Sequence, residues 1–319
     1  MSDESVLVLP NETTAIELKK ADQHPIAVYL ARLAPRSRIA MASTLSVITR
    51  MVSNSEASIE TFPWQSLRYQ HISALRSQLA EIYSPSRANG CLAALRGVMK
   101  ECWQLGLITA DEYNRIKAVP PVRGERLPKG RALSRGEIRT LFLECAKDQT
   151  QAGARDAALL AILYGCGLRR SEAVALDLKD YDQQNKSLKV RAGKGNKERM
   201  VYLTSGSERA LNNWLDIRGT IEGPIFFRII KGDHIANKRL TDQAIMWILK
   251  ERAESAGVAT FSPHDLRRTF IGDLLDAGAD IATVQQMAGH SQVTTTARYD
   301  RRGESAKRKA SDLLFIPFE

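Results

Sequence analysis

The sequence predicts a mainly α-helical protein with a small antiparallel β-sheet, an α+β fold divided into two domains. Apolar residues recur at helical spacing through most of the chain. The period changes to short, β-rich runs only at 187–203. Segment 118–131 is rich in proline, glycine and basic residues, so it cannot support a packed helix. We therefore expect a helical first half, a linker, and a second half that holds the sheet.

The composition is that of a soluble globular protein with an excess of positive charge. Of the 319 residues, 44% are hydrophobic and 26% are charged. The 46 Lys and Arg against 36 Asp and Glu give a formal net charge of +10. Such a balance favours a polyanionic partner, most simply nucleic acid. The alternative is a cytosolic protein that is merely basic.

Two further features favour the cytoplasm. The cysteines form no C-x-x-C pair and have no metal-ligand spacing, which is typical of reduced, partly buried thiols: Cys91, Cys102, Cys145 and Cys166. The N-terminal stretch is acidic rather than basic, and no segment approaches about 18 consecutive apolar residues. Neither a secretory signal nor a membrane-spanning helix is expected.

The first half, after a loose arm at 1–19, reads as a helical domain over 20–117. Apolar periodicity predicts helices within 24–52, with a break at Pro35, within 61–83, and within 84–108. Five basic side chains on these helices are candidates for contacts with DNA phosphates, although scattered surface arginines are also normal: Arg36, Arg38, Arg87, Arg96 and Lys100.

The linker at 118–131 is also basic. Its candidates for DNA contacts are Arg123, Arg126, Lys129 and Arg131. A basic linker between two domains suits a protein that closes around a duplex and contacts its backbone at the hinge. The alternative is a solvated spacer.

The second half, 132–319, begins with a helix start signal. Ser134 followed by Glu137 predicts a capping box. The helix near 155–167 is apolar nearly all round and is predicted to be central in the core. A β-hairpin is predicted at 187–203, with Gly195-Asn196 at its tip. Further helices are expected at about 206–217, 241–256, 263–276, 280–288 and 292–302.

Arg169 and Lys194 are the first candidates for chemistry. Arg169 follows a buried helix and a Gly-x-Gly turn, where its planar fork could bind a phosphate with Glu172 as its orienting partner. The alternative is an Arg–Glu pair that ties two helices together. Lys194 on a hairpin loop could reach a phosphate and donate a proton to a leaving oxygen, or it could be an ordinary surface lysine.

His264 and Arg267 are three residues apart and share one helical face. A cation beside the histidine disfavours a metal, and no H-E-x-x-H motif or carboxylate cluster accompanies the pair, so no metal site is expected. The pair suits phosphate chemistry. His290 could hydrogen-bond an anion at a helix end. A phenol such as that of Tyr299 is a weak nucleophile, since the reference pKa of a free phenol is about 10, but neighbouring arginines would favour the phenolate.

Three segments carry a family resemblance. "GCGLRRSEAVALDLKDYD", "VRAGKGNKERMVYL" and "PHDLRRTFIGDLLDAGADIATVQQMAGHSQVTTTARY" follow one another in this order. Together they resemble the catalytic domain of the tyrosine recombinase family, the phage-integrase and Xer type, over about 132–302. The preceding helices resemble, by pattern only, that family's SAM-like core-binding domain. The resemblance implies a site-specific DNA recombinase that needs no cofactor, metal or ATP.

The same resemblance implies a role for each matching position. Arg169 and Arg267 would bracket the scissile phosphate, and Lys194 would protonate the leaving 5′ oxygen. Tyr299 would attack and form a 3′-phosphotyrosyl link. His264 would act as the acid–base partner of the tyrosine hydroxyl, and His290 would donate a hydrogen bond to a non-bridging oxygen. Glu172 and Asp265 would orient these side chains. Arg268 replaces a histidine that is common in Xer-type members and is a further candidate for a DNA contact, so integration/excision or resolution of a mobile element or plasmid is favoured.

The implied partner is double-stranded DNA with a paired core site. The protein would bind as a dimer on each site and as a tetramer in the synapse, in the cytoplasm and associated with the nucleoid when bound to DNA. Its tail is basic and then apolar, and either docks on a neighbouring protomer or folds back on its own core; the apolar residues are Leu313, Leu314, Phe315, Ile316 and Phe318.

Three alternatives accompany this interpretation. A type IB topoisomerase shares the chemistry but would relax DNA without sequence preference. A telomere resolvase usually has a longer chain. A DNA-binding regulator on the same scaffold would lack one or more catalytic positions, and none is missing here.

Overall fold

The structure is a computed structural model that describes residues 23–53, 57–124, 130–191, 198–303, 311–312 and 317. The chain divides into two compact units between Pro128 and Lys129. Within the described residues, no helix combines the length and the apolar character that crossing a membrane requires. The four cysteines are buried, free thiols.

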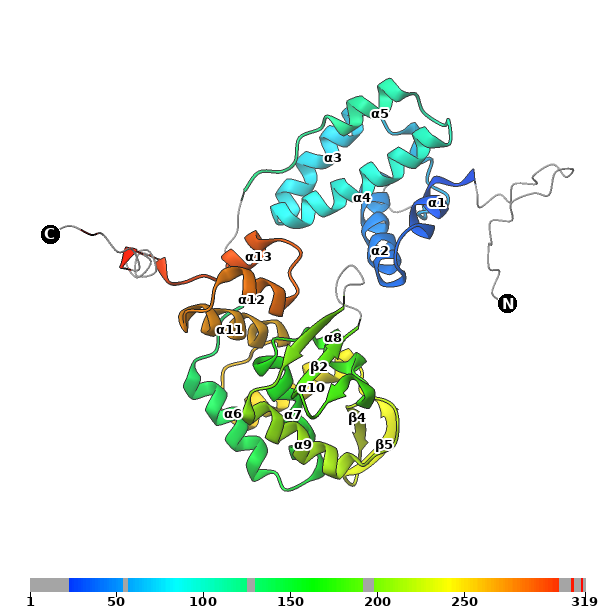
Figure 1. The fold of residues 1–319 in the computed structure, drawn as a ribbon. Coiled ribbons are helices and arrows are strands. Elements are labelled where there is room, and N and C mark those ends of the chain that lie inside the picture. The colour runs from blue at the N-terminus through cyan, green and yellow to red at the C-terminus, as the bar shows by residue number, and fades with distance from the viewer. Residues whose placement is uncertain are drawn as a thin grey trace, which may run out of the picture. The chain divides into compact units, whose positions relative to one another are not determined.

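The first unit is a bundle of helices around α4 (Figure 1). Its helices are α1 Pro25–Ala31, α2 Pro35–Val52, α3 Tyr69–Ile82, α4 Pro85–Gln104 and α5 Ala110–Lys117, with a short 3₁₀ turn, η2, at Trp64–Ser66. The predicted break at Pro35 is confirmed, because this proline occupies the first turn of α2. The side-chain oxygen of Ser84 accepts a hydrogen bond from the Arg87 amide and thereby caps α4.

Two predictions for the first unit differ from the structure. The helix expected from residue 61 begins at Tyr69, because the preceding residues form η2 around the buried Trp64. Helix α5 was not expected. It is only 8 residues long and starts at a capping box between Thr109 and Glu112.

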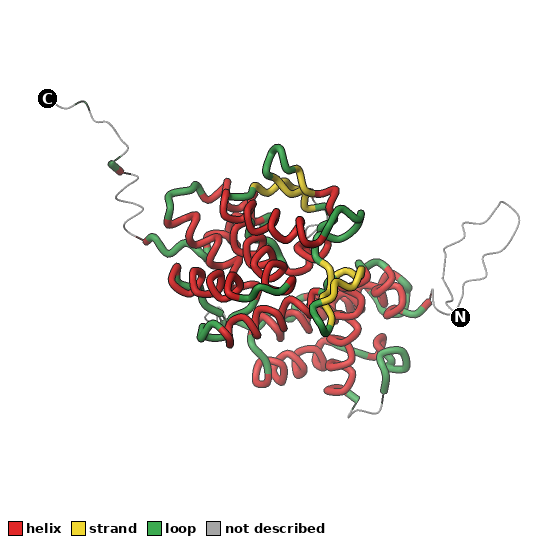
Figure 2. The backbone as a smooth tube through the Cα atoms, turned by 90° about the horizontal axis from the view of Figure 1, so that it is seen from below, coloured by secondary structure: helices red, strands yellow, loops and turns green. Residues whose placement is uncertain are grey.

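The second unit combines helices with two small antiparallel sheets (Figure 1). Its helices are α6 Arg135–Lys147, α7 Gln151–Gly165, α8 Arg170–Ala175, α9 Ser205–Arg218, α10 Asp242–Ser255, α11 Pro263–Asp276, α12 Ile281–Ala288 and α13 Val293–Ala297, with a 3₁₀ turn, η3, at Leu178–Asp180. The strands are β1 Tyr181–Asp182, β2 Ser187–Val190, β3 Arg199–Tyr202, β4 Phe227–Ile230 and β5 His234–Arg239. Figure 2 shows the dominance of helix over strand, which confirms the predicted fold class.

The predicted hairpin is confirmed as the pair of β2 and β3, in which Leu188 faces Val201. Its predicted tip, Gly195-Asn196, lies outside the described residues. The β4–β5 hairpin was not expected from the sequence. The helix predicted to run to 302 ends at Ala297. The capping box of Ser134 and Glu137 is confirmed at the start of α6.

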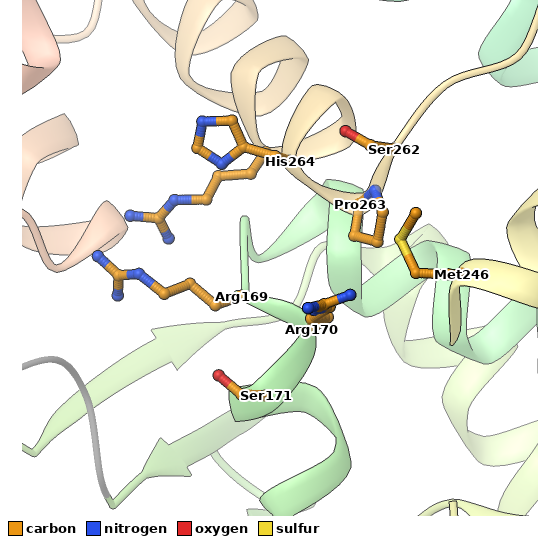
Figure 3. A pocket seen from close by; sticks show the side chains of 8 residues that line it. Arg169, Arg170, Ser171, Met246, Ser262, Pro263 and His264 are labelled. Carbon is orange, nitrogen blue, oxygen red and sulfur yellow. The ribbon is translucent and has the colours of Figure 1, made fainter. Parts of the chain in front are cut away.

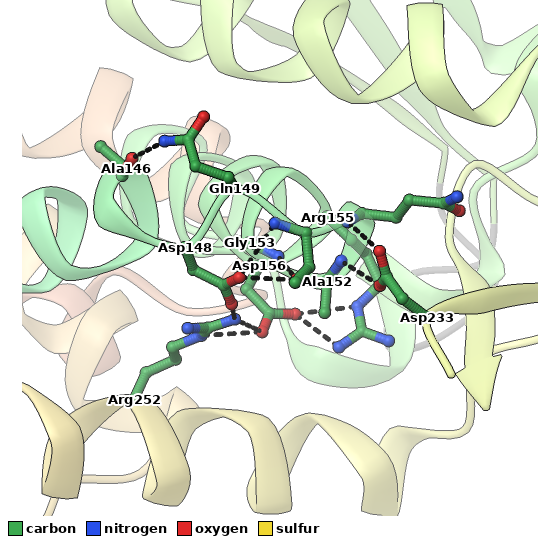
Figure 4. A network of polar contacts seen from close by, with 11 residues as sticks. Ala146, Asp148, Gln149, Ala152, Gly153, Arg155, Asp156, Asp233 and Arg252 are labelled. Atoms are coloured by element: carbon green, nitrogen blue, oxygen red, sulfur yellow. Dashed lines mark hydrogen bonds and ion pairs between the residues drawn. The ribbon is translucent and has the colours of Figure 1, made fainter. Parts of the chain in front are cut away.

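Helix α7 is the centre of the second unit, as its all-round apolar sequence predicts. A polar network anchors its N-terminal half (Figure 4). Asp156 on α7 pairs with Arg155 and with Arg252 of α10, and Arg252 also pairs with Asp148. Asp233, in the turn between β4 and β5, accepts hydrogen bonds from the first two amides of α7. These contacts hold the N-terminal half of the helix whose other end leads to Arg169.

Candidate active site

Helix α11 carries two of the candidates and has a strongly determined start. Pro263 occupies its first turn, and the Asp265 carboxylate accepts hydrogen bonds from the amide and hydroxyl of Ser262 at 2.9 and 2.8 Å. The other oxygen of Asp265 accepts from the Arg131 amide at 3.0 Å. Asp265 therefore fixes the position of the helix end that carries His264 and Arg267.

Arg267 is an almost fully buried arginine, with 1% of its surface exposed. Its guanidinium donates to the carbonyl of Gly167 at 2.6 Å and to the carbonyl of Ala288. Burial and the nearby charge of Arg169 lower the pKa of Arg267. An arginine stays protonated at neutral pH even so. The side chain thus holds a positive charge between the turn after α7 and the end of α12.

Arg169 projects from the turn between α7 and α8. Gly167 makes this turn possible, because its φ is +59° and a Cβ there would lie 2.2 Å from the Phe270 ring. The Arg169 guanidinium donates to Glu172 at 2.7 Å and to the carbonyl of Gly289 at 3.1 Å. Glu172 is buried and also accepts two hydrogen bonds from Arg199, at 3.1 and 2.8 Å. Burial alone would raise the pKa of Glu172, but Arg199 and Arg169 outweigh burial and hold that pKa at about 2.

His264 and Tyr299 are in direct contact. The Nε2 atom of His264 lies 3.1 Å from the Tyr299 hydroxyl. Burial and the charges of Arg267 and Arg268 lower the pKa of His264, so its imidazole is neutral at pH 7. The Arg268 guanidinium lies over the Tyr299 ring, with its Cζ 5.6 Å from the ring centroid. The phenol is therefore placed between a neutral base and a cation.

His290 lies on another side of Tyr299. The two rings stack with centroids 6.0 Å apart. The Nδ1 atom of His290 is 2.9 Å from the hydroxyl of the buried Thr296. Burial, with Arg267 and Arg169, lowers the pKa of His290 to about 4. A neutral ring whose Nδ1 accepts from the threonine hydroxyl presents Nε2–H as a donor.

An open pocket of about 350 Å³ adjoins these residues (Figure 3). The side chains of Arg169 and His264 extend to the same side of it. The pocket is lined by Arg169, Arg170, Ser171, Met246, Ser262, Pro263, His264 and Arg267. Three arginines in this lining, Arg169, Arg170 and Arg267, make the pocket suited to an anion.

The structure brings most of the sequence-predicted site residues together. Arg169, Glu172, Arg267 and His290 meet around the end of α12, while His264 joins them through Tyr299. Lys194 lies outside the described residues.

Sequence reasoning missed Arg199 and Thr296. Both lie inside the quoted motifs, five residues after Lys194 and three before Tyr299. Arg199 was interpreted only as part of a β-rich run.

Eight of the ten candidates for DNA contact fall into three groups. Arg38 and Arg96 donate to backbone carbonyls within the first unit, and Arg87 donates to the Thr44 hydroxyl. Lys100 and Arg123 are exposed. The side chain of Arg36, together with Arg126 and Lys129, is outside the described parts.

Two candidates lie in the second unit. Arg131 donates to the Ala259 carbonyl and pairs with Glu137. Arg268 lies 3.8 Å from Asp265 and faces Tyr299. Among the candidates for DNA contact whose side chains the structure describes, Arg268 is the one that contacts the predicted nucleophile.

Comparison with known proteins identifies the family. The phage integrase family matches residues 131–305. Tyrosine recombinase XerC of Corynebacterium efficiens is 34% identical over 232 residues, which is 70% of this chain and 71% of the relative. Tyrosine recombinase XerD of Mycobacterium leprae is 36% identical over 65% of this chain and 67% of the relative. XerC of Corynebacterium glutamicum is 35% identical, and the match spans 60% of that relative's length.

Solved structures share the fold. The Tn1549 transposon integrase in complex with transposon right end DNA superposes with a TM-score of 0.65 at 17% identity, covering 91% of this chain and 98% of that one. A lambda integrase dimer bound to a COC′ core site gives a TM-score of 0.62 at 14% identity, covering 93% and 97%.

The fold and the site thus define a recombinase that uses a tyrosine. The chain belongs to the phage integrase family, and it is a site-specific recombinase of the tyrosine class. The alternatives of a regulator or a topoisomerase-like enzyme are not favoured by these relatives.

Proposed function

We propose that this recombinase cuts and rejoins double-stranded DNA through a covalent 3′-phosphotyrosyl link to Tyr299. The observation that carries the proposal is the hydrogen-bond distance of 3.1 Å between the Tyr299 hydroxyl and His264, beside the buried Arg267. A nucleophile, a neutral base and a fixed cation therefore share one small region.

The first step is attack by the tyrosine oxygen on the scissile phosphorus. His264 accepts the phenol proton, which its lowered pKa permits because the ring is neutral before the reaction. Charge grows on the phosphate oxygens as the new P–O bond forms. Arg169 and Arg267 stabilise that charge, since each guanidinium has five N–H donors and the contacts with protein use only part of them.

The second half of the step is departure of the 5′ oxygen. We assign its protonation to Lys194, by resemblance, so that a 5′ hydroxyl is freed and Tyr299 holds the 3′ phosphate. His290 donates from Nε2 to a non-bridging oxygen, with Thr296 holding the ring through Nδ1. Attack by a 5′ hydroxyl of another strand reverses these transfers and needs no ATP, because the phosphotyrosyl link retains the energy of the phosphodiester.

The proposed partner is a DNA duplex with a paired core site. The net charge of +10 supports it. The proposal is also supported by the similar folds of the Tn1549 transposon integrase in complex with transposon right end DNA and of the lambda integrase dimer bound to a core site. We propose a dimer on each site and a tetramer in the synapse, with the C-terminal tail docking on a neighbouring protomer. The helical unit would be the core-binding domain, 118–131 the basic linker, and 132–319 the catalytic domain.

The proposed biological role is integration/excision or resolution of a mobile element or plasmid. Arg268 supports a mobile-element integrase, because it stands where Xer-type members often carry histidine. We place the protein in the cytoplasm, associated with the nucleoid when it is bound to DNA.

Trapping a covalent adduct tests the proposed chemistry. Nicked duplex fragments from the DNA that flanks the gene are incubated with the protein, denatured and run on a gel. We expect an adduct on one fragment, and none with Tyr299→Phe, whose fold should be unchanged. If no fragment yields an adduct while one is bound specifically, the chain acts as a regulator. Relaxation of a plasmid that lacks the site would instead indicate a topoisomerase.

A further inference from the structure

We propose that Arg199 is a positioning residue of the active site, which keeps Arg169 available for the scissile phosphate and fixes the backbone before His290. This inference rests on the proposed function, since it concerns how the phosphate is held. Arg199 is the first residue of β3, on the strand that follows the hairpin loop of Lys194. Its side chain is only 12% exposed.

The end of α12 is held by three arginines from three different elements. Arg199 donates from Nε to the carbonyl of Met287 at 3.1 Å. Arg267 donates to the next carbonyl, that of Ala288, and Arg169 to the one after it, that of Gly289, at 3.1 Å. The last carbonyls of a helix lack partners within the helix and carry partial negative charge. Three successive carbonyls are thus paired with cations immediately before His290.

Gly289 adapts the backbone to this arrangement. Its φ of +63° is the left-handed conformation in which α12 ends. A Cβ built on Gly289 would lie 3.0 Å from Cζ of Arg199. The chain therefore turns toward His290 directly against the Arg199 guanidinium, so displacement of Arg199 would leave this turn without its support.

Arg199 also changes the net charge of the group that it forms with Glu172 and Arg169. Glu172 is a buried carboxylate within hydrogen-bond distance of both Arg169 and Arg199. With Arg169 alone it would form a neutral one-to-one pair, and the charge of Arg169 would be largely compensated. Arg199 brings the trio to a net charge of +1. Arg169 can then present positive charge to a phosphate while Glu172 still orients it.

The test compares four variants on the nicked duplex to which the unaltered protein forms its covalent adduct. These are Arg199→Met, Glu172→Gln, the double variant, and Arg209→Met, which removes an exposed charge on α9 as a control. The rate of adduct formation is measured at saturating protein, with DNA binding measured separately by gel shift. Thermal melting monitors folding.

We expect Arg199→Met to slow adduct formation by about 10- to 100-fold, the range typical of residues that orient active-site ligands, with DNA binding little changed. Because Glu172→Gln removes the charge that Arg199 balances, the double variant should be faster than Arg199→Met. A residue that acts only through packing would not show this recovery. The Arg209→Met control should equal the unaltered protein.

Two results would overturn the inference. One is an Arg199→Met variant as fast as the unaltered protein, and the other is a double variant no faster than Arg199→Met. If Arg199→Met does not fold, Arg199→Gln with and without Glu172→Gln makes the same comparison, because glutamine also removes the charge but keeps N–H donors for the carbonyl of Met287. If the unaltered protein forms no adduct at all, the proposed function fails, and the inference fails with it.

Discussion

The buried carboxylate of Glu172 should make the stability of the second unit depend on pH. Glu172 is 4% exposed. Its burial would raise the pKa, but Arg199 and Arg169 lower it from 4.5 to about 2. A difference of roughly 2.5 pKa units, at about 1.4 kcal/mol per unit, corresponds to roughly 3.5 kcal/mol of folding free energy.

The direction of the effect follows from proton uptake. The unfolded chain protonates this carboxyl near pH 4.5, whereas the folded protein does so only near pH 2. Between these values the unfolded state binds more protons, so acid favours unfolding. The contribution of Glu172 is therefore complete above about pH 5 and is lost as the pH falls toward 2.

Urea unfolding of the unaltered protein and of Glu172→Gln measures this contribution. Trp214 is buried in the second unit, so its exposure contributes to the change in tryptophan fluorescence when that unit unfolds. The gap in unfolding free energy between the two proteins should narrow by about 1.4 kcal/mol from pH 6 to pH 3.5, and by about 2.5 of the roughly 3.5 kcal/mol by pH 2.5.

An exposed acid on α10 serves as the control for the same measurement. Glu254→Gln should show no comparable narrowing. A gap for Glu172→Gln that stays constant from pH 6 to pH 2.5 would refute the reasoning, since it would mean that the carboxylate is not held in its ionised form by the arginines.

Two substitutions near His290 give further predictions. Gly289→Ala forces a non-glycine residue to φ +63° and brings its Cβ to 3.0 Å from Cζ of Arg199. We therefore expect the unfolding free energy to fall by about 1–2 kcal/mol and the covalent adduct to form more slowly. An unfolding free energy in urea equal to that of the unaltered protein would contradict this. Thr296→Val keeps the shape of the side chain but removes the hydroxyl that lies 2.9 Å from Nδ1 of His290. We expect this variant to form the adduct about tenfold more slowly, and Thr296→Ser, which keeps a hydroxyl, to form it at the normal rate. An unchanged rate for Thr296→Val would count against the role of Thr296.

The sequence predicted the elements whose signals are local. Helix α11 occupies the range expected from its serine cap, its first-turn proline and its apolar period. The hairpin of β2 and β3 follows from a change of period. The β4–β5 hairpin was missed because its strands lack a clear alternation of buried and exposed residues, with only Phe227 fully buried.

The site was predictable to the extent that its residues lie in motifs. His264 and Arg267 share a helical face, so their proximity is a local property. The contact between His264 and Tyr299 joins residues 35 apart and was implied only by family resemblance. Arg199 could not be found by either route, because its partners are a buried carboxylate and a backbone carbonyl brought from two other elements.

The contacts of the arginines also explain how the active site is organised before DNA binds. Burying the Arg267 charge in isolation would be costly, and its repulsion by Arg169 adds to that cost. The carbonyls at the end of α12 contact all three guanidiniums, and the Glu172 carboxylate contacts those of Arg169 and Arg199, so fixed negative charge offsets both terms. The cations are therefore held in place by the protein itself rather than by the phosphate. A phosphate that enters such a site meets charges that need little reorganisation, which is the condition under which electrostatic stabilisation of a transition state is largest.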